Sequence, residues 1–296
     1  MSMFWTQVET SMGQCLPSID ARQFLAARTL DLVNSCYDLP SSEDRFLCLK
    51  GQEFFFQKTL SKDHSLSCSD CHQPSEDGGR IPILKARQHG WQTSPNLMDI
   101  GRRERPFFWN GRARTLEGSI FWPLYHKDEM GHSPESLESR GGASFVVKAL
   151  ASFLRQRKGD LGSFDHYLSG DCFALSTQQT EGLKAFINSG CDYCHRGAEF
   201  TDNRTHKLVY YDLPNSYFQQ GEARYLADYQ RFSKPSDSIS LKTKTPTLRN
   251  LTHAKEWGRF GFRGNLSTYI HSHSQQVGLT RSVNSEAISS FIREAL

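Results

Sequence analysis

The chain has 296 residues, of which 37% are hydrophobic and 23% are charged, and its formal net charge is +3. This length allows about two domains, and the composition predicts a soluble globular protein. The small net charge gives no argument for nucleic-acid binding. No stretch of the sequence approaches the roughly 18 consecutive apolar residues of a membrane span.

The first third of the chain predicts helices followed by a long loop. Residues 1–45 are expected to form an N-terminal helical extension, because apolar side chains recur at imperfect helical spacing between residues 21 and 36. A further helix is expected at residues 51–60, directly before a Cys-x-x-Cys-His motif. The segment 73–108 is rich in Gly, Pro and Arg and predicts a loop.

The rest of the chain continues this pattern. Residues 134–168 have helical spacing of apolar side chains, and residues 180–188 predict a short helix before a second Cys-x-x-Cys-His motif. Residues 201–247 are expected to be mostly loop. Because strand-like alternation is nearly absent, we expect an all-α fold with long loops.

The two Cys-x-x-Cys-His motifs are the most informative feature of the sequence. Each is the attachment signature of a c-type haem. Two thiols three positions apart can form thioethers with the two vinyl groups of one porphyrin, and the histidine that follows can bind the iron. We therefore expect two covalently bound c-type haems, held by Cys68, Cys71 and His72 and by Cys191, Cys194 and His195.

Zinc binding and dithiol redox chemistry are the alternative interpretations of these motifs. Two cysteine pairs of one zinc site usually lie roughly 15–20 residues apart, whereas Cys68 and Cys191 are far more distant in the sequence. Zinc also gives no reason for a histidine at the same offset in both motifs. A thioredoxin-like dithiol requires a βαβ pattern, which the sequence lacks. A porphyrin in each core also accounts for the long loops.

Four of the eight cysteines lie outside the motifs, namely Cys15, Cys36, Cys48 and Cys172. Their even number permits disulfides, although free buried thiols are an equal alternative. Covalent haem attachment in bacteria takes place outside the cytoplasmic membrane, so we expect a periplasmic protein. Residues 1–5 themselves carry no basic or apolar region of a signal peptide.

The two halves of the chain share a pattern that predicts a duplicated haem module. A Gly-x-x-x-Phe segment precedes each motif, and a Pro-x-Leu segment follows much later in each half, at residues 95–97 and 246–248. We expect the N-terminal extension at 1–45, a first haem domain at 46–165 and a second haem domain at 166–296.

Long, spaced motifs surround both haem signatures. They include Phe-Trp-Asn-Gly-Arg-Ala at 108–113, Phe-Thr-Asp at 200–202 and Thr-Pro-Thr-Leu-Arg-Asn at 245–250. From about residue 51 to residue 264, the sequence resembles the bacterial dihaem cytochrome c peroxidases and their relative MauG. This resemblance implies two cytochrome c-like haem domains and chemistry with hydrogen peroxide.

The resemblance also implies roles for single residues. Trp109 matches the tryptophan between the two haems, while Glu129 and Pro123 match residues on the open face of the peroxide-reacting haem. The alternative for Glu129 is a solvated residue in the polar run 127–129. A buried core position for Trp109 is compatible with its role. Arg112 is expected to hold a haem propionate, because a guanidinium can bind a carboxylate through two parallel hydrogen bonds. His206 and Arg249 are expected near the second haem.

The sixth ligand of the second haem is where the sequence departs from its relatives. The peroxidases use a methionine and MauG a tyrosine, but no methionine follows Met130 in this chain. Asn265 is expected to cap a helix that directs Leu266 and Ile270 inward. We expect His273, on the same side, to be the ligand, with His271 and then Tyr269 as alternatives. A surface His-x-His pair remains the other interpretation.

Two further features of the family stay open at the sequence level. An open distal face at the first haem is favoured over ligation by His89. The calcium ion that the family holds between its haems is possible here, but Gln92, Thr93 and Ser94 stand where the family has an asparagine, and Lys244 lies in the second ligand segment.

The leading hypothesis is a MauG-like enzyme that uses hydrogen peroxide to oxidise a protein or peptide substrate by long-range electron transfer, through a bis-Fe(IV)-type state. The first alternative is a cytochrome c peroxidase that receives electrons from a small redox protein. The second alternative is a non-enzymatic dihaem electron carrier.

Overall fold

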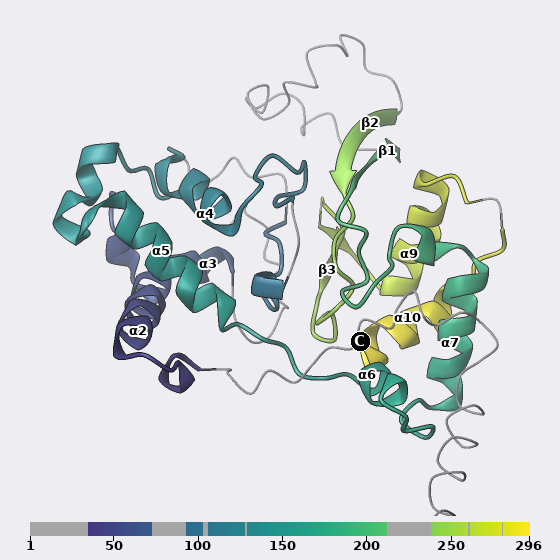
Figure 1. The fold of residues 1–296 in the computed structure, drawn as a ribbon. Helices are drawn as coiled ribbons and strands as arrows, with labels where there is room; N and C mark the ends of the chain where they lie inside the picture. The colour runs from purple at the N-terminus through teal and green to yellow at the C-terminus, as the bar shows by residue number, and fades with distance from the viewer. Residues whose placement is uncertain are drawn as a thin grey trace, which may run out of the picture.

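A computed structural model describes residues 35–72, 93–102, 106–127, 129–211, 238–259, 261–279 and 281–296. Most of the expected N-terminal extension, with Cys15, lies outside these residues, as do His89 and Gln92. The described elements form two groups of helices, with the strands β1, β2 and β3 drawn between or beside them (Figure 1). No helix among the described residues is long and apolar enough to span a membrane.

The first group of helices surrounds the first haem motif. Its α-helices are α2 (Ser42–Phe56), α3 (Cys68–Cys71), α4 (Leu116–Tyr125) and α5 (Gly142–Arg155), and its 3-10 helices are η2 (Cys36–Asp38), η3 (Lys58–Leu60), η5 (Ile100–Arg102) and η6 (Pro134–Arg140). Helix α2 begins where the Ser41 hydroxyl accepts a hydrogen bond from the Asp44 N–H at 2.9 Å. Its buried side chains join one hydrophobic core together with those of α4 and α5.

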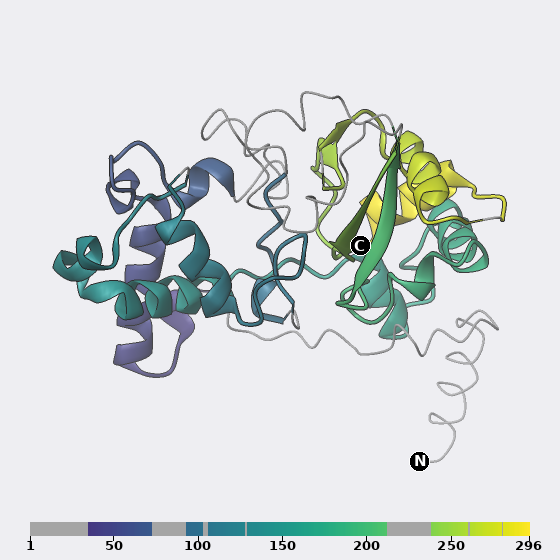
Figure 2. The ribbon, with the colours of Figure 1, turned by 90° about the horizontal axis from the view of Figure 1, so that it is seen from above.

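The second group surrounds the second motif and has its own hydrophobic core. Its elements are α6 (Ser163–Leu168), α7 (Thr177–Asn188), η7 (Cys191–Tyr193), α9 (Leu266–Gln276) and α10 (Ser285–Ala295). Two antiparallel pairs of strands accompany them, β1 (Thr205–Tyr211) with β2 (Ser238–Lys244) and β3 (Glu256–Trp257) with β4 (Phe262–Arg263). Figure 2 shows the β1–β2 ribbon beside the helices of this group.

The duplicated Gly-x-x-x-Phe pattern marks the same helix crossing in both groups. A Cβ atom on Gly51 of α2 would overlap the carbonyl oxygen of Ala149 in α5. In the second group, a Cβ atom on Gly182 of α7 would overlap the carbonyl oxygen of Ala287 in α10. Both glycines therefore allow two helix backbones to approach closely. This repeated crossing supports the predicted duplication.

The phenylalanine that follows each glycine packs on the opposing helix four residues beyond the alanine. The ring centroids of Phe55 and Phe153 lie 5.3 Å apart, and those of Phe186 and Phe291 lie 5.9 Å apart. Such aromatic pairs add to the area that they bury. The two modules thus share a helix pair whose first helix precedes the haem motif in sequence and whose second helix follows it.

The prediction of a loop across residues 201–247 is wrong at both ends of the segment. Strands β1 and β2 pair there over seven residues each, from Thr205 opposite Lys244 to Tyr211 opposite Ser238. The missed signal is the alternation in β2, where Leu241 and Thr243 are buried and Lys242 between them is exposed. The fold is therefore mainly helical, with a small antiparallel sheet. The expected helical stretch 134–168 is also divided into η6, α5 and α6.

A seam of hydrogen bonds joins the two modules. The Thr93 N–H donates to the Arg259 carbonyl at 2.9 Å, and the Thr93 hydroxyl donates to the Gly258 carbonyl at 2.8 Å. The buried Asp99 carboxylate accepts from the Asn250 amide at 2.8 Å. Buried polar groups that are paired in this way fix the arrangement of the segments that carry them.

Candidate haem sites

The first motif forms a short capped helix that ends at His72. The Ser67 N–H donates to the Asp70 carboxylate at 2.8 Å, which fixes the start of α3. The His72 Nδ1–H donates to the Pro95 carbonyl at 3.1 Å. Burial lowers the pKa of His72 to about 4. The imidazole is therefore neutral at physiological pH, and the Nδ1–H bond leaves Nε2 as the nitrogen suited to bind a metal.

The second motif presents His195 in the same way. Its Nδ1–H donates to the Phe200 carbonyl at 3.0 Å. Burial, followed by the proximity of His273, lowers the pKa of His195 to about 4, while the Pro246 carbonyl opposes this shift. The proline of the Pro-x-Leu segment is thus the hydrogen-bond acceptor of the motif histidine in the first module, whereas Phe200 has this role in the second.

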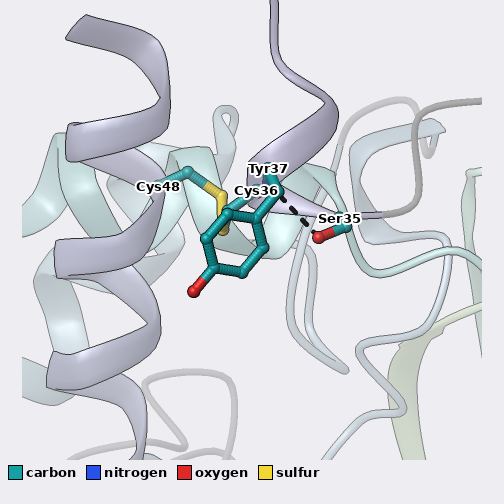
Figure 3. Close-up of a disulfide and its surroundings, with 4 residues drawn as sticks. All are labelled: Ser35, Cys36, Tyr37 and Cys48. Atoms are coloured by element: carbon teal, nitrogen blue, oxygen red, sulfur yellow. Dashed lines mark hydrogen bonds between the residues drawn. A yellow bond between two sulfur atoms is a disulfide. The ribbon is translucent and has the colours of Figure 1, made fainter. Parts of the chain in front are cut away.

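The four motif cysteines are free, while other cysteines of the chain form disulfides. Cys36 is bonded to Cys48, which ties η2 to α2 beside Ser35 and Tyr37 (Figure 3), and Cys172 is also disulfide-bonded. The prediction that the even remainder of cysteines permits disulfides is thus confirmed for the described residues.

The chemistry of the motif thiols fits thioether bonds. Burial, followed by the Cys71 thiolate, raises the pKa of Cys68 to about 12, and burial raises the pKa of Cys191 to about 11. Both thiols are therefore protonated at neutral pH, and the uncharged thioethers that a covalently attached haem would form suit these buried positions.

His273 lies across from His195 in the second module. The Asn265 side chain caps α9 by accepting from the Thr268 N–H at 2.7 Å, and Leu266 and Ile270 are buried, as predicted. The ring centroids of His195 and His273 lie 6.3 Å apart, with their planes inclined by 68°.

This separation matches two imidazoles that share one metal ion. With a metal–nitrogen bond of about 2.0 Å and a nitrogen about 1.2 Å from the ring centre, two rings on opposite sides of an ion lie roughly 6.4 Å apart. Burial lowers the pKa of His273, so this imidazole is also neutral and able to bind a metal. The space between the two rings therefore fits an iron with histidine on both sides.

The two alternative ligands lie differently. His271 is exposed, and its Nε2 is 3.3 Å from the Gln275 side-chain nitrogen. The Tyr269 ring stacks on His273 with 5.8 Å between the ring centroids and an angle of 11° between the planes. Among the described residues of α9, His273 is thus the one of these three whose ring lies against that of His195.

Glu129 and Pro123 lie at the C-terminal end of α4, near the first motif. The Met130 N–H donates to the Pro123 carbonyl at 3.1 Å, which folds the segment after α4 back onto the helix. The Glu129 carboxylate lies 3.7 Å from the Nδ1 of His126. Burial is the main cause that raises the pKa of the Cys71 thiol to about 11, and the negative charge of Glu129 is the second cause. Glu129 therefore acts electrostatically on the thiols of the first motif.

Trp109 lies in the seam between the modules. The side chain is buried, and its indole N–H donates to the Thr93 carbonyl at 2.8 Å. Its own carbonyl accepts from the Lys244 N–H at 2.7 Å, at the end of β2. Trp109 is thereby bonded to both modules, and its role as the tryptophan between the haems stays a prediction.

The three expected propionate or second-haem partners have other contacts in the structure. The Arg112 guanidinium lies 3.5 Å from the centre of the Phe108 ring and donates to the Asn110 side chain at 3.2 Å. Arg249 is buried and donates to both carboxylate oxygens of Asp165, at 2.8 and 2.7 Å. The assignment of Arg112 to a haem propionate and of Arg249 to the second haem stays a prediction.

His206 pairs with Asp202 beside the second motif. The His206 Nε2 lies 2.7 Å from the Asp202 carboxylate. Burial raises the pKa of the Cys194 thiol, and the negative charge of Asp202 is the second cause of this shift. Among the described residues, Cys194, Asp202 and His206 form the one cluster of histidine, cysteine and acidic side chains with metal-ligand spacing. Because Cys194 belongs to the haem motif, this cluster gives no support for a separate calcium site.

A calcium ion between the modules stays a prediction. In the segment near its expected position, the Lys244 ammonium donates to the Thr245 carbonyl at 3.1 Å.

Sequence reasoning missed several residues that position these groups. The Phe200 carbonyl orients His195, and Asp165 neutralises the buried Arg249. The Arg249 Nε–H also donates to the Ala198 carbonyl at 2.9 Å, two residues before Phe200. A backbone carbonyl carries no sequence signal. Asp165 and Arg249 lie far apart in the sequence, so a single sequence does not show that they form a pair.

The sequence is similar to proteins of one family. A family model described as di-haem cytochrome c peroxidase matches residues 49–144. Cytochrome c551 peroxidase of Pseudomonas aeruginosa is 33% identical over 174 residues, which cover 50% of this chain and 49% of the relative. The chain thus spans about half the length of that relative. Methylamine utilization protein MauG of Methylophilus methylotrophus is 26% identical over 254 residues, which cover 76% of this chain and 71% of the relative.

Solved structures share the fold. A MauG-like protein associated with microbial copper homeostasis superposes with a TM-score of 0.65 at 21% identity, covering 87% of this chain and 90% of the other. The diheme peroxidase BthA from Burkholderia thailandensis gives a TM-score of 0.64 at 18% identity, with 87% and 86% of the two chains covered. With its two haem-binding motifs, this chain is similar to MauG and the bacterial dihaem cytochrome c peroxidases, a family of haem-dependent oxidoreductases that carry two c-type haems.

Proposed function

We propose that the chain is a MauG-like dihaem enzyme that uses hydrogen peroxide to oxidise a protein or peptide substrate. The observation that carries this proposal is the asymmetry of the two sites. His273 faces His195 in the second module at 6.3 Å, whereas the carboxylate of Glu129 lies near the thiols of the first motif. One site is thus suited to store charge and the other to receive a small oxidant.

The haems, when bound, would supply the binding and two-electron reduction of hydrogen peroxide and would hold the oxidising equivalents. The residues of the chain supply orientation and proton transfer. His72 and His195, each fixed by a backbone carbonyl, would bind one iron from one side. His273 would bind the second iron from the other side, and the proposed first site would stay open there.

Glu129 would move a proton at the open site. Cleavage of the peroxide bond requires that a proton is taken from the near oxygen and delivered to the far oxygen. The Glu129 side chain is 34% exposed, so it can reach a small molecule at the site. Pro123, whose carbonyl accepts from the Met130 N–H, would hold the chain around Glu129 in place.

Trp109 would carry electrons between the modules. Its hydrogen bonds to Thr93 on one side and Lys244 on the other support a fixed position for the indole. An aromatic ring in that position offers an electron-transfer route that does not require the two haems to touch. Oxidising equivalents produced at the first site could then be shared with the second.

The histidine opposite His195 favours this function over that of a cytochrome c peroxidase. No methionine follows Met130, so the second module has no thioether to serve as a ligand. Imidazole donates more electron density than a thioether and favours the oxidised iron. This tuning suits the storage of oxidising equivalents. A non-enzymatic carrier, the remaining alternative, has no use for an acid such as Glu129.

The periplasm is the proposed location. The bond between Cys36 and Cys48 supports it, because disulfides persist in oxidising compartments and are rare in the cytosol. Covalent attachment of two haems points to the same compartment.

The test is to add hydrogen peroxide to the fully oxidised holoprotein without prior reduction. We expect one equivalent of peroxide to be consumed and to leave the protein able to accept two electrons from ferrocytochrome c, a protein donor. A requirement for half-reduction before peroxide reacts would favour the peroxidase. Two low-spin haems that do not react with peroxide would favour the carrier.

A further inference from the structure

Tyr269 lies directly beside the proposed ligand of the second haem. Its ring is nearly parallel to that of His273, with 11° between the planes and 5.8 Å between the centroids. His273 in turn faces His195 at 6.3 Å. A phenol is among the side chains that are most easily oxidised. Tyr269 is therefore placed to exchange an electron with the metal site through a stacked ring.

The fold makes room for the phenol group. A Cβ atom on Gly258 would overlap the Tyr269 hydroxyl oxygen, and Gly258 has a φ of +67°, which favours glycine. The Gly258 carbonyl accepts from the Thr93 hydroxyl at 2.8 Å, and the Thr93 carbonyl accepts from the Trp109 indole at 2.8 Å. The tyrosine thus ends at the same seam that holds the bridging tryptophan.

On its other side Tyr269 meets the protein surface. The Phe262 ring centroid lies 5.8 Å from that of Tyr269, and 37% of Phe262 is exposed. Phe262, Tyr269, His273 and His195 therefore form a row of rings with successive centroid separations of 5.8, 5.8 and 6.3 Å. This row leads from an exposed aromatic edge to the second site.

We propose that Tyr269 is a redox relay through which the substrate delivers electrons to the second site, and that the substrate is oxidised at the Phe262 end of this row. The inference rests on the proposed function, which supplies the oxidant. The protein substrate of that proposal would present its oxidisable group at its surface, because the row of rings ends at the exposed Phe262.

The electron balance is as follows. Tyr269, which is half-buried, loses one electron to the oxidised site, and its phenol releases one proton to solvent. The substrate then returns one electron to the tyrosyl radical, and a proton from water restores the phenol. Two such passages, together with two protons, complete the conversion of one hydrogen peroxide to two water molecules, and the substrate loses two electrons.

The variant Tyr269→Phe tests the relay, because it keeps the ring that stacks on His273 and removes the group that is oxidised. The matched control is Tyr193→Phe, since Tyr193 lies within the second motif and is 80% exposed. Both holoproteins are mixed with peroxide and frozen for electron paramagnetic resonance. Ferrocytochrome c is the protein donor in a parallel stopped-flow measurement.

We expect wild type and Tyr193→Phe to give a tyrosyl radical signal that narrows when the tyrosines are ring-deuterated. In Tyr269→Phe the signal should be absent, and oxidation of ferrocytochrome c should slow by at least roughly tenfold. The rate of peroxide consumption and the spectra of the oxidised haems should not change.

The relay is overturned if Tyr269→Phe retains the radical signal or the wild-type rate of donor oxidation, or if Tyr193→Phe loses them instead. In those cases peroxide still reacts, so the proposed function stands. If wild-type protein fails to consume peroxide, the proposed function and the relay are both rejected.

Discussion

The two modules have nearly the same frame but differ on one side of the haem site. In each, a glycine lets two helices cross closely, and the motif histidine donates Nδ1–H to a backbone carbonyl, at 3.1 Å for His72 and 3.0 Å for His195. In both, burial lowers the pKa of this histidine to about 4. The frame thus holds two neutral imidazoles in the same way.

The difference lies opposite these imidazoles. In the second module His273 of α9 faces His195, whereas within the described part of the first module the corresponding functional group near the motif is the carboxylate of Glu129. A duplicated frame can therefore serve two purposes when one module supplies a second ligand and the other supplies an acid. Four substitutions test this contrast.

The largest effect is expected from His273→Gly. Loss of the proposed sixth ligand should convert the second haem from low spin to high spin, because only His195 then binds the iron. Electron paramagnetic resonance of the oxidised holoprotein measures this change directly. His271→Gly is the matched control on the exposed side of α9 and should keep the low-spin signal. A low-spin signal that survives in His273→Gly but not in His271→Gly would reverse the assignment.

Glu129→Gln should slow the reaction with peroxide by about 10²–10⁴-fold, the usual contribution of a positioned acid–base group. The amide keeps the size of the side chain but cannot accept the proton. Stopped-flow absorbance of the oxidised holoprotein measures the rate. Glu117→Gln is the control, since Glu117 lies on α4 but pairs with Arg155 at 2.5 Å near the surface. Equal rates for Glu129→Gln and wild type would remove the functional contrast between the modules.

Replacement of both Cys36 and Cys48 by alanine should reduce the free energy of unfolding by about 3 kcal/mol, because the disulfide closes a short loop in the unfolded chain. The two cysteines are separated by 12 positions and lie in the first module. Denaturant unfolding, followed through the absorbance of each haem, should show the loss at the first haem before the second. Simultaneous loss of both haem signals would show that the two hydrophobic cores do not unfold separately.

The smallest effect on stability is expected from Trp109→Phe. The variant loses the indole hydrogen bond to the Thr93 carbonyl, worth about 1 kcal/mol. Its electronic effect should be more specific, because the sharing of charge between the haems weakens while their spin states stay unchanged. Near-infrared absorbance after peroxide addition measures that sharing. An unchanged near-infrared signal would remove Trp109 from the electron route.

The sequence predicted the features that depend on residue type and spacing. These include both Cys-x-x-Cys-His motifs, the cap at Asn265, the inward direction of Leu266 and Ile270, and the repeated Gly-x-x-x-Phe and Pro-x-Leu segments. Each has a local physical cause, such as a close helix crossing at Gly51 and Gly182.

Features that depend on contacts between distant segments could not be predicted. The β1–β2 pair joins strands on either side of residues 212–237, and the alternation in β2 was too short to identify alone. The Asp165–Arg249 pair links residues 84 positions apart, so neither residue signals the other in a single sequence. The ring contact between Tyr269 and His273 follows from the helix geometry of α9 but has no meaning until His195 is known to lie opposite.

The spin states of the oxidised wild-type holoprotein test the central claim most directly. The account predicts one high-spin haem, bound by His72 alone, and one low-spin haem, bound by His195 and His273, in equal amounts by electron paramagnetic resonance. Two low-spin haems, or two high-spin haems, would contradict it.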